Sequence, residues 1–164
     1  AAGAAFALIG SATPSSEAPE TERGLTLTWS AGPATLPRDD AAYAPLVAPL
    51  TGRGLLPFAP TRLSARRLSN GDLRLAWIRR ARIGGDDFDA REVRLGEETE
   101  AYEAEIWFGG VRVRAFEVAS PAALYTSAQQ AVDLGGPAVE IELRVRQISA
   151  VAGPGLTAAA SFAV

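Results

Sequence analysis

The sequence predicts an all-β fold, a β-sandwich, from three observations. Apolar and polar residues alternate along several segments, and this period of two is typical of strands with one buried face. Turn signals that contain glycine, proline or asparagine separate these segments. No stretch sustains the periodicity of an amphipathic helix, which favours the packing of sheet on sheet.

Residues 1–56 are expected to be the end of a preceding β-containing domain with its linker. "AAGAAFALIG" and "LTLTWSAG" have the composition of strands, but charged and proline-rich connectors flank them. This segment has too few apolar positions for a core of its own. Because the chain has no initiator methionine, Ala1 is either a processed N-terminus or the cut end of a longer protein, and we expect the second. "GRGLLPFAP" then forms a stiff joint before a sandwich at residues 57–164.

Residues 61–80 predict a hairpin whose second strand carries a tryptophan. An Asn-Gly dipeptide between "TRLSARRL" and "LRLAWIRR" tolerates the positive φ angles of a tight turn. In the second segment, Leu73, Leu75 and Trp77 share one face. A tryptophan that alternates with leucines is expected in the core rather than on a ligand-binding surface. Only the arginines that follow Trp77, Arg79 and Arg80, indicate a contact with a partner.

Residues 102–118 predict a second hairpin around a Gly-Gly dipeptide. A two-residue loop at this dipeptide places Trp107 opposite Arg112 and Glu105 opposite Arg114. The polar face would then carry a Glu105–Arg114 ion pair beside a Trp107–Arg112 cation-π pair. Trp107 is therefore either the hairpin's own cation-π partner or a contact for a sugar or a neighbouring subunit.

The segment "VEIELRVRQIS" predicts a half-buried strand. Val139, Ile141, Leu143 and Val145 fall on one face, and charged residues alternate with them on the other. A final strand, "LTAAASFAV", follows the turn "AGPG". These two segments complete the predicted sandwich.

The composition excludes several function classes. The chain of 164 residues is 48% hydrophobic with a net charge of −3, so no general attraction to nucleic acid or anionic membrane is expected. It has no cysteine, histidine, methionine or lysine, and all 16 basic residues are arginines. Disulfides, thiolate or imidazole nucleophiles, the usual zinc sites and Schiff-base lysines are thereby excluded. We expect no cofactor, no metal site, no membrane insertion and no enzymatic activity in this chain.

The order of three segments resembles a fibronectin type III domain, an immunoglobulin-like β-sandwich. These segments are "LRLAWIRR", "YEAEIWF" and "VEIELRVRQISAVAGPGLTAAASF". The resemblance implies that Trp77 on strand B packs under Tyr102 on strand C. One departure is Ile141, which stands in the stretch of strand F where that family usually carries a tyrosine. The expected core comprises inward-facing residues of these strands: Leu73, Leu75, Trp77, Tyr102, Ile141, Leu143 and Val145.

A wider pattern resembles the C-terminal end of the large tail-tip, or host-specificity, protein of gene transfer agents and related siphophage-like tails. The motifs are "GRGLLPFAPTRLSARRLSNGDLRLAWIRRARIGGDDF", "VRLGEETEAYEAEIW" and "LYTSAQQAVDLGG". That family carries a TIM-barrel-like, hydrolase-like domain upstream, and no catalytic residue of the barrel would fall in this chain.

The resemblance implies a structural and interaction module of a phage-like tail tip or baseplate. Its expected partners are other tail-tip subunits, further copies in a homotrimer of the parent chain, and polysaccharide of the recipient-cell envelope. It would act outside the cell, on the tail of the particle. The alternative is a fibronectin-type glycan-binding or spacer domain of a secreted carbohydrate-active enzyme.

Two charged stretches are the remaining candidates for a site. "GDDFD" and "GEETEAYEAE" concentrate carboxylates, but their spacing does not match a calcium loop, so an exposed acidic surface is expected. Nine arginines between Arg62 and Arg94 face five carboxylates. They could bind phosphate, DNA or acidic polysaccharide, but intersubunit salt bridges and ordinary surface are favoured. The candidates for a partner contact are Arg79, Arg80, Arg82 and Trp107.

Overall fold

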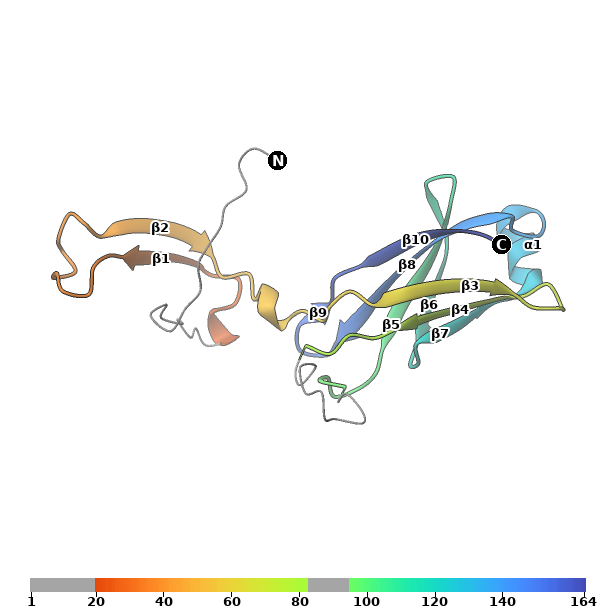
Figure 1. Ribbon diagram of the computed structural model, residues 1–164, viewed down its shortest axis with the longest axis horizontal. Helices are drawn as coiled ribbons and strands as arrows, with labels where there is room; N and C mark the ends of the chain where they lie inside the picture. The colour runs from red at the N-terminus through yellow and green to blue at the C-terminus, as the bar shows by residue number, and fades with distance from the viewer. Residues whose placement is uncertain (1–19, 83–94) are drawn as a thin grey trace. The chain divides into compact units, whose positions relative to one another are not determined.

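A computed structural model describes residues 20–82 and 95–164 (Figure 1). The chain forms two compact units, Ala1–Gly52 and Arg53–Val164. The strand expected within the first ten residues and the acidic "GDDFD" stretch both lie outside the described residues.

The first unit contains a short 3₁₀ turn, η1 (Glu20–Glu22), and an antiparallel hairpin of β1 (Thr26–Ala31) and β2 (Ala44–Pro49). Between residues 20 and 52, the structure describes no buried side chain. A two-stranded hairpin without a core is at best marginally stable in water.

The second unit is a β-sandwich of two sheets. The smaller sheet has the strand order β3-β4-β7, and the larger has the order β10-β8-β5-β6 with β9 paired to β8. The elements are η2 (Arg53–Leu55), β3 (Thr61–Arg67), β4 (Leu73–Ile78), β5 (Tyr102–Phe108), β6 (Val111–Val118), β7 (Ala122–Tyr125), α1 (Ser127–Leu134), β8 (Glu140–Ser149), β9 (Gly153–Pro154) and β10 (Ala158–Ala163). The all-β prediction is confirmed.

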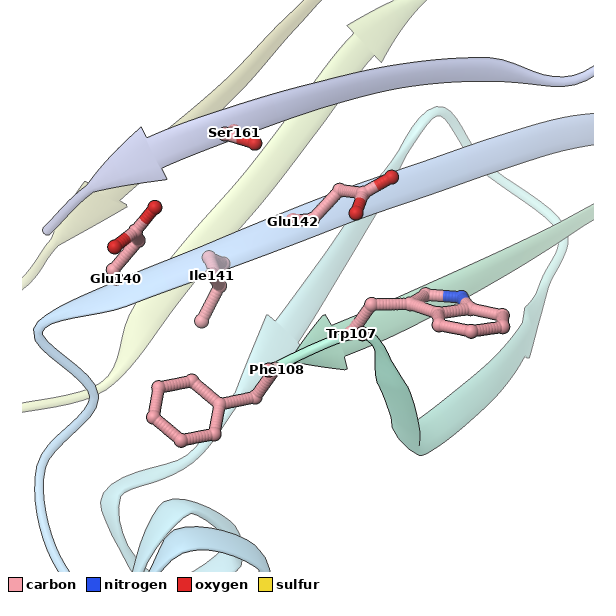
Figure 2. A pocket seen from close by; sticks show the side chains of 8 residues that line it. Trp107, Phe108, Glu140, Ile141, Glu142 and Ser161 are labelled. Carbon is pink, nitrogen blue, oxygen red and sulfur yellow. The ribbon is translucent and has the colours of Figure 1, made fainter.

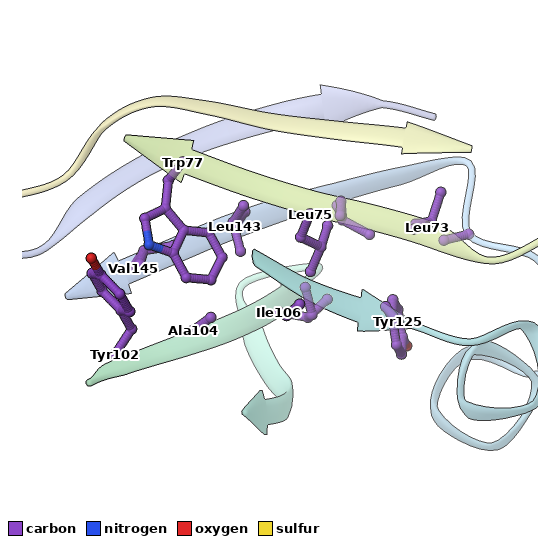
Figure 3. Packing of buried hydrophobic residues seen from close by; sticks show 12 residues of the cluster. Leu73, Leu75, Trp77, Tyr102, Ala104, Ile106, Tyr125, Leu143 and Val145 are labelled. Atoms are coloured by element: carbon purple, nitrogen blue, oxygen red, sulfur yellow. The ribbon is translucent and has the colours of Figure 1, made fainter. Parts of the chain in front are cut away.

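The core lies between the two sheets, where β4 faces β5 and β8 (Figure 3). The rings of Trp77 and Tyr102 meet edge to face, with 5.4 Å between their centroids and 72° between their planes. This is the contact that the fibronectin resemblance implies. The structure buries every residue of the expected core: Leu73, Leu75, Trp77, Tyr102, Ile141, Leu143 and Val145. Val139 differs from the prediction, because β8 begins after it and 73% of its surface is exposed.

The β5–β6 hairpin turns through a two-residue loop, as predicted. Gly109 and Gly110 have φ angles of 57° and 80°, values that L-residues with a Cβ rarely adopt. Trp107 pairs with Arg112 as expected, but the register shifts after Ile106. Ile106 therefore faces Arg114, and the predicted Glu105–Arg114 pair is wrong. The physical reason is a β-bulge, which adds one residue to β6 and changes the direction of the side chains that follow.

Helix α1 was not predicted, because no stretch of the sequence sustains helical periodicity. Thr126 is its N-cap and forms a capping box with Gln129, while Gly135 ends the helix in the left-handed conformation with φ 78°. The helix has eight residues, about two turns. A helix of two turns is too short to show a sustained hydrophobic periodicity. Its two ends are specified by the capping residues instead.

A buried glutamine attaches α1 to the sandwich. Gln130 is fully buried, and its Nε2 donates to the carbonyls of Tyr125 at 2.9 Å and Gly71 at 3.1 Å. Its Oε1 accepts from the Ala138 amide at 3.2 Å and from Arg67 at 3.3 Å. Every hydrogen-bonding group of this side chain is thus used, as a buried polar group requires.

A second polar cluster joins α1 to the edges of both sheets. Asp133 of α1 accepts two hydrogen bonds from the Arg114 guanidinium, at 2.6 and 2.8 Å, and one from the Tyr125 hydroxyl at 2.9 Å. The hydrogen bonds from Arg114 lower the pKa of the Asp133 carboxyl, against the opposing effect of burial. The bulge in β6 makes this contact possible, because it turns the Arg114 side chain toward the helix.

The lowered pKa predicts how stability depends on pH. Asp133→Asn should lower the free energy of unfolding at pH 7 by about 1.5–3 kcal/mol, because hydrogen bonds to a charged group are lost. The pKa of Asp133 is lower in the folded chain than in the unfolded chain, where it is about 3.9. The stabilisation by the Asp133 carboxylate is therefore fully present above the unfolded pKa, and it is lost as the pH falls through the folded pKa. Denaturant titrations of both proteins from pH 7 to pH 2 should therefore converge in acid. Asp39→Asn, at an exposed position, is the control, and a difference that persisted at pH 2 would contradict the assignment.

Candidate interaction site

The outer face of the larger sheet carries a ladder of ion pairs. Arg146 donates to Glu103 at 2.6 Å across β8 and β5, and Arg112 donates to Glu105 at 2.8 Å across β6 and β5. The ladder continues on β8, where Arg144 donates to Glu142 at 2.7 Å. Each of its three arginines therefore has a carboxylate partner. The strand pairing produces this arrangement, because it sets glutamate opposite arginine on neighbouring strands.

Trp107 lies at the end of this ladder. The Arg144 guanidinium stacks on its ring, with Cζ 3.8 Å from the ring centroid, and its Nε1 donates to Glu105 at 2.9 Å. A cation-π pair is present, but the predicted partner, Arg112, is wrong. Arg144 takes this place because β8 lies on the other side of β5 and brings its arginine diagonally next to the tryptophan. Trp107 is half-buried in the ladder.

The same network fixes the charge of Glu105. Partial burial by itself would raise the pKa of this carboxyl, but hydrogen bonds from Arg112 and Trp107 outweigh it, and the pKa is lowered. Glu105 therefore stays ionised and is not suited to act as a general acid near neutral pH.

An open hollow of about 380 Å³ lies beside Trp107 at the β5–β6 turn (Figure 2). It is lined by Trp107, Phe108, Gly109, Gly110, Glu140, Ile141, Glu142 and Ser161. The carboxylates of Glu140 and Glu142 and the hydroxyl of Ser161 offer hydrogen-bond acceptors, while Phe108 adds an apolar ring that is 45% exposed. Such a lining suits a ligand rich in hydroxyl or amide donors.

The three arginines of the predicted partner contact have intramolecular partners. Arg79 lies 3.9 Å from Glu100, and Arg82 lies 3.9 Å from Glu97. The Arg80 guanidinium lies over the Phe58 ring, with Cζ 5.1 Å from the centroid. The contacts of Arg79 and Arg82 join the segment after β4 to the segment before β5, and that of Arg80 joins it to the segment before β3.

The structure does not bring these arginines together with Trp107. Arg79 interacts with Glu100, next to the start of β5 at Tyr102, whereas Trp107 is near the other end of that strand. The strand rise separates Tyr102 from Trp107 by about 17 Å. The direction of β5 therefore separates the arginines from Trp107, although all four residues were predicted to contact a partner.

Two features bear on catalysis and membrane contact. In residues 20–82 and 95–164, no cluster of three or more histidine, cysteine, aspartate or glutamate side chains is positioned to hold a metal ion. Over the same part of the chain, the helices are too short and too polar to cross a bilayer.

Some residues that organise the fold were missed in the sequence. Gln130 and Asp133 belong to a helix that the periodicity did not reveal, although the capping sequence Thr126-Ser-Ala-Gln129 was a usable signal. Arg66 and Arg74 were treated as general surface, yet the hairpin register places them directly opposite each other.

The strand order of the two sheets and the Trp77–Tyr102 contact make this sandwich fibronectin type III-like. Comparison with family models gave no match, and neither did comparison with curated proteins.

Solved structures similar to the chain include domains d3–d4 of the rat CD45 extracellular region. That similarity has 12% identity and a TM-score of 0.47, over 98% of this chain and 75% of that one. A fibronectin type III domain derived from human KIAA0970 protein is 16% identical, with a TM-score of 0.46 over 67% of this chain and 75% of that one. The FN1–FN3 domains of chicken CNTN1 are 15% identical, with a TM-score of 0.43 over 74% of this chain and 35% of that one. These are similarities of fold, and they assign no activity or partner.

Proposed function

We propose that this chain is a structural and interaction module of a phage-like tail tip or baseplate, of the kind found in gene transfer agents. The support in the sequence is the pair of motifs "LAWIRRARIGGDDF" and "LGEETEAY", which a generic fibronectin spacer would not need. In this role the chain helps assembly with other tail-tip subunits, as part of a homotrimer of its parent chain. It also contributes to contact with the recipient-cell envelope, and it performs no catalysis itself.

The observation that carries the assembly role is the apolar face of the β1–β2 hairpin. Trp29 pairs with Leu46 and Leu27 pairs with Ala48, so these side chains lie on one face of the hairpin. Leu46 is 63% exposed and Leu25 is 52% exposed. Among residues 20–52 nothing buries this face, and a two-stranded sheet without a covering surface is unstable. The rest of the parent protein or a neighbouring tail subunit supplies it in our proposal.

The contact role of the arginines can be tested by charge reversal. Arg79→Glu/Arg80→Glu/Arg82→Glu should reduce particle assembly or attachment to recipient cells by about tenfold or more, since repeated copies multiply a weak contact. The measurement is a count of assembled and of attached particles, after circular dichroism has shown that the chain is folded.

The intramolecular pairs of Arg79 and Arg82 call for a control. Combining the triple reversal with Glu97→Arg/Glu100→Arg restores opposite charges at both pairs. Assembly and attachment should stay impaired in this variant. Full recovery would mean that the arginines only hold the two segments together, and normal attachment by the triple reversal would remove them from the contact.

The hollow beside Trp107 favours the second candidate, a glycan-binding domain of a secreted carbohydrate-active enzyme. Its acceptor groups and exposed phenylalanine suit the donor hydroxyls and apolar faces of a neutral sugar. Tight binding of neutral oligosaccharides by the chain alone, measured by calorimetry and lost in Trp107→Ala, would favour this candidate over the tail tip.

A further inference from the structure

We infer that the outer face of the smaller sheet is a docking surface for an acidic protein surface. This inference deepens the proposed function, on which it rests only in taking the partner to be a neighbouring subunit. The surface consists of outward-facing residues of three strands: Ser64 and Arg66 on β3, Arg74, Ala76 and Ile78 on β4, and Ala122 and Leu124 on β7.

The central feature of this face is a pair of opposed arginines. Arg66 and Arg74 are directly opposite each other across β3 and β4, and both are exposed. Like charges in this position repel each other. Across residues 20–82 and 95–164, neither arginine has a carboxylate within ion-pair distance. An anion between the two guanidinium groups would remove the repulsion and form charge-assisted hydrogen bonds.

The larger sheet differs from the smaller one, because the arginines on its outer face have carboxylate partners. On its outer face, Arg112, Arg144 and Arg146 each pair with a glutamate of the same face. Within residues 20–82 and 95–164, the chain thus neutralises the arginines on the outer face of the larger sheet, whereas Arg66 and Arg74 of the smaller sheet have no carboxylate within ion-pair distance. Positive charge that has no carboxylate partner among the described residues is suited to pair with negative charge from outside the molecule.

Apolar groups beside the arginines identify the partner as a protein. Leu124 pairs with Arg74 in the same cross-strand row and is 46% exposed, and Ile78 on the same face is 50% exposed. Arginine beside exposed aliphatic side chains is typical of protein interfaces. None of the seven residues that define this face is aromatic, so they offer no ring on which a nucleotide base could stack. A net charge of −3 also opposes binding of a dense polyanion.

The surface extends toward the β3–β4 turn. A shallow hollow adjoins the arginine pair, and it is lined by Arg66, Arg67, Leu68, Ser69 and Asn70. At the other end of β3, Arg62 is exposed and stands at the bulge between Thr61 and Ser64. Its φ of 50° is in the left-handed region that favours glycine.

The test uses the full chain and a fluorescein-labelled peptide of alternating glutamate and leucine, followed by fluorescence anisotropy at low salt. We expect this peptide to bind, and Arg66→Glu/Arg74→Glu to weaken the binding by about tenfold or more. The matched control, Arg38→Glu/Arg53→Glu, makes the same change of charge at two exposed arginines and should bind as the unmodified chain does. A peptide with glutamine in place of glutamate should not bind. Arg66→Thr/Arg74→Thr, which removes the repulsion, should also weaken binding while raising the denaturation midpoint of the free chain.

Three outcomes would overturn the inference. The first is no binding of the glutamate-leucine peptide, and the second is equal binding by Arg66→Glu/Arg74→Glu. The third is tighter binding of polygalacturonate or a single-stranded oligonucleotide than of the peptide, which would assign the face to a polyanion. All three can occur while the chain remains a tail-tip component, whereas absence of the chain from particles would refute the proposed function alone.

Discussion

Trp77→Ala is expected to lower the free energy of unfolding of the sandwich by about 3–5 kcal/mol. The indole is 4% exposed and packs edge to face on Tyr102 between the two sheets. Its removal would leave a cavity that strands fixed in two hydrogen-bonded sheets cannot close. Because a domain of this size has only about 5–15 kcal/mol of stability, much of the protein should be unfolded at physiological temperature.

The measurement is denaturant unfolding followed by far-ultraviolet circular dichroism, with two controls. Trp77→Phe keeps an aromatic ring and removes an Nε1 that is buried without a hydrogen-bond partner in the described structure, so it should cost much less than the alanine variant. Trp107→Ala removes an indole from the outer face and should also have a small effect. A midpoint unchanged by Trp77→Ala would contradict the placement of β4 in the core.

Gln130→Leu is expected to lower the free energy of unfolding by about 2–5 kcal/mol, although it keeps the side-chain volume. The leucine cannot accept from the Ala138 amide, which would stay buried without its partner, and it cannot donate to the carbonyls of Tyr125 and Gly71. Each such group costs about 1–3 kcal/mol. The loss therefore arises from hydrogen bonding and not from a cavity.

The neighbouring glutamine provides the matched control for this substitution. Gln129→Leu loses only the capping bond to the Thr126 amide, and a lost cap costs about 0.5–2 kcal/mol. Hydrogen exchange adds a local measurement, since the Ala138 amide should lose protection in Gln130→Leu and keep it in Gln129→Leu. Equal destabilisation by the two substitutions would refute the anchoring role of Gln130.

The strands of the sandwich could be predicted because their information is local. Leu73, Leu75 and Trp77 alternate with polar residues on one strand, and the glycines at 109 and 110 define a turn of fixed length. When apolar and polar residues alternate along a strand, the apolar residues become buried once that face of the sheet is covered. The same reasoning failed at α1, where eight residues between two caps give too little periodicity to detect.

The candidate sites were less predictable, because they depend on pairing between distant residues. Trp107 was expected to stack on Arg112, but the guanidinium that stacks on its ring is that of Arg144 on β8. The pair of Arg114 was misassigned because its partner, Asp133, lies on the helix that the periodicity missed. A bulge in β6 brings Arg114 to Asp133, and no pattern of residues in the sequence predicted this bulge.

The most direct test of the proposed function is an electron cryomicroscopy map of the tail-bearing particles to which we propose that this chain belongs. We predict symmetry-related copies of the sandwich at the tail tip, with the Leu27, Trp29 and Leu46 face of the hairpin covered by protein. Particles that lack the sandwich at the tip, or that carry it as an isolated domain with this face exposed to solvent, would contradict the proposal.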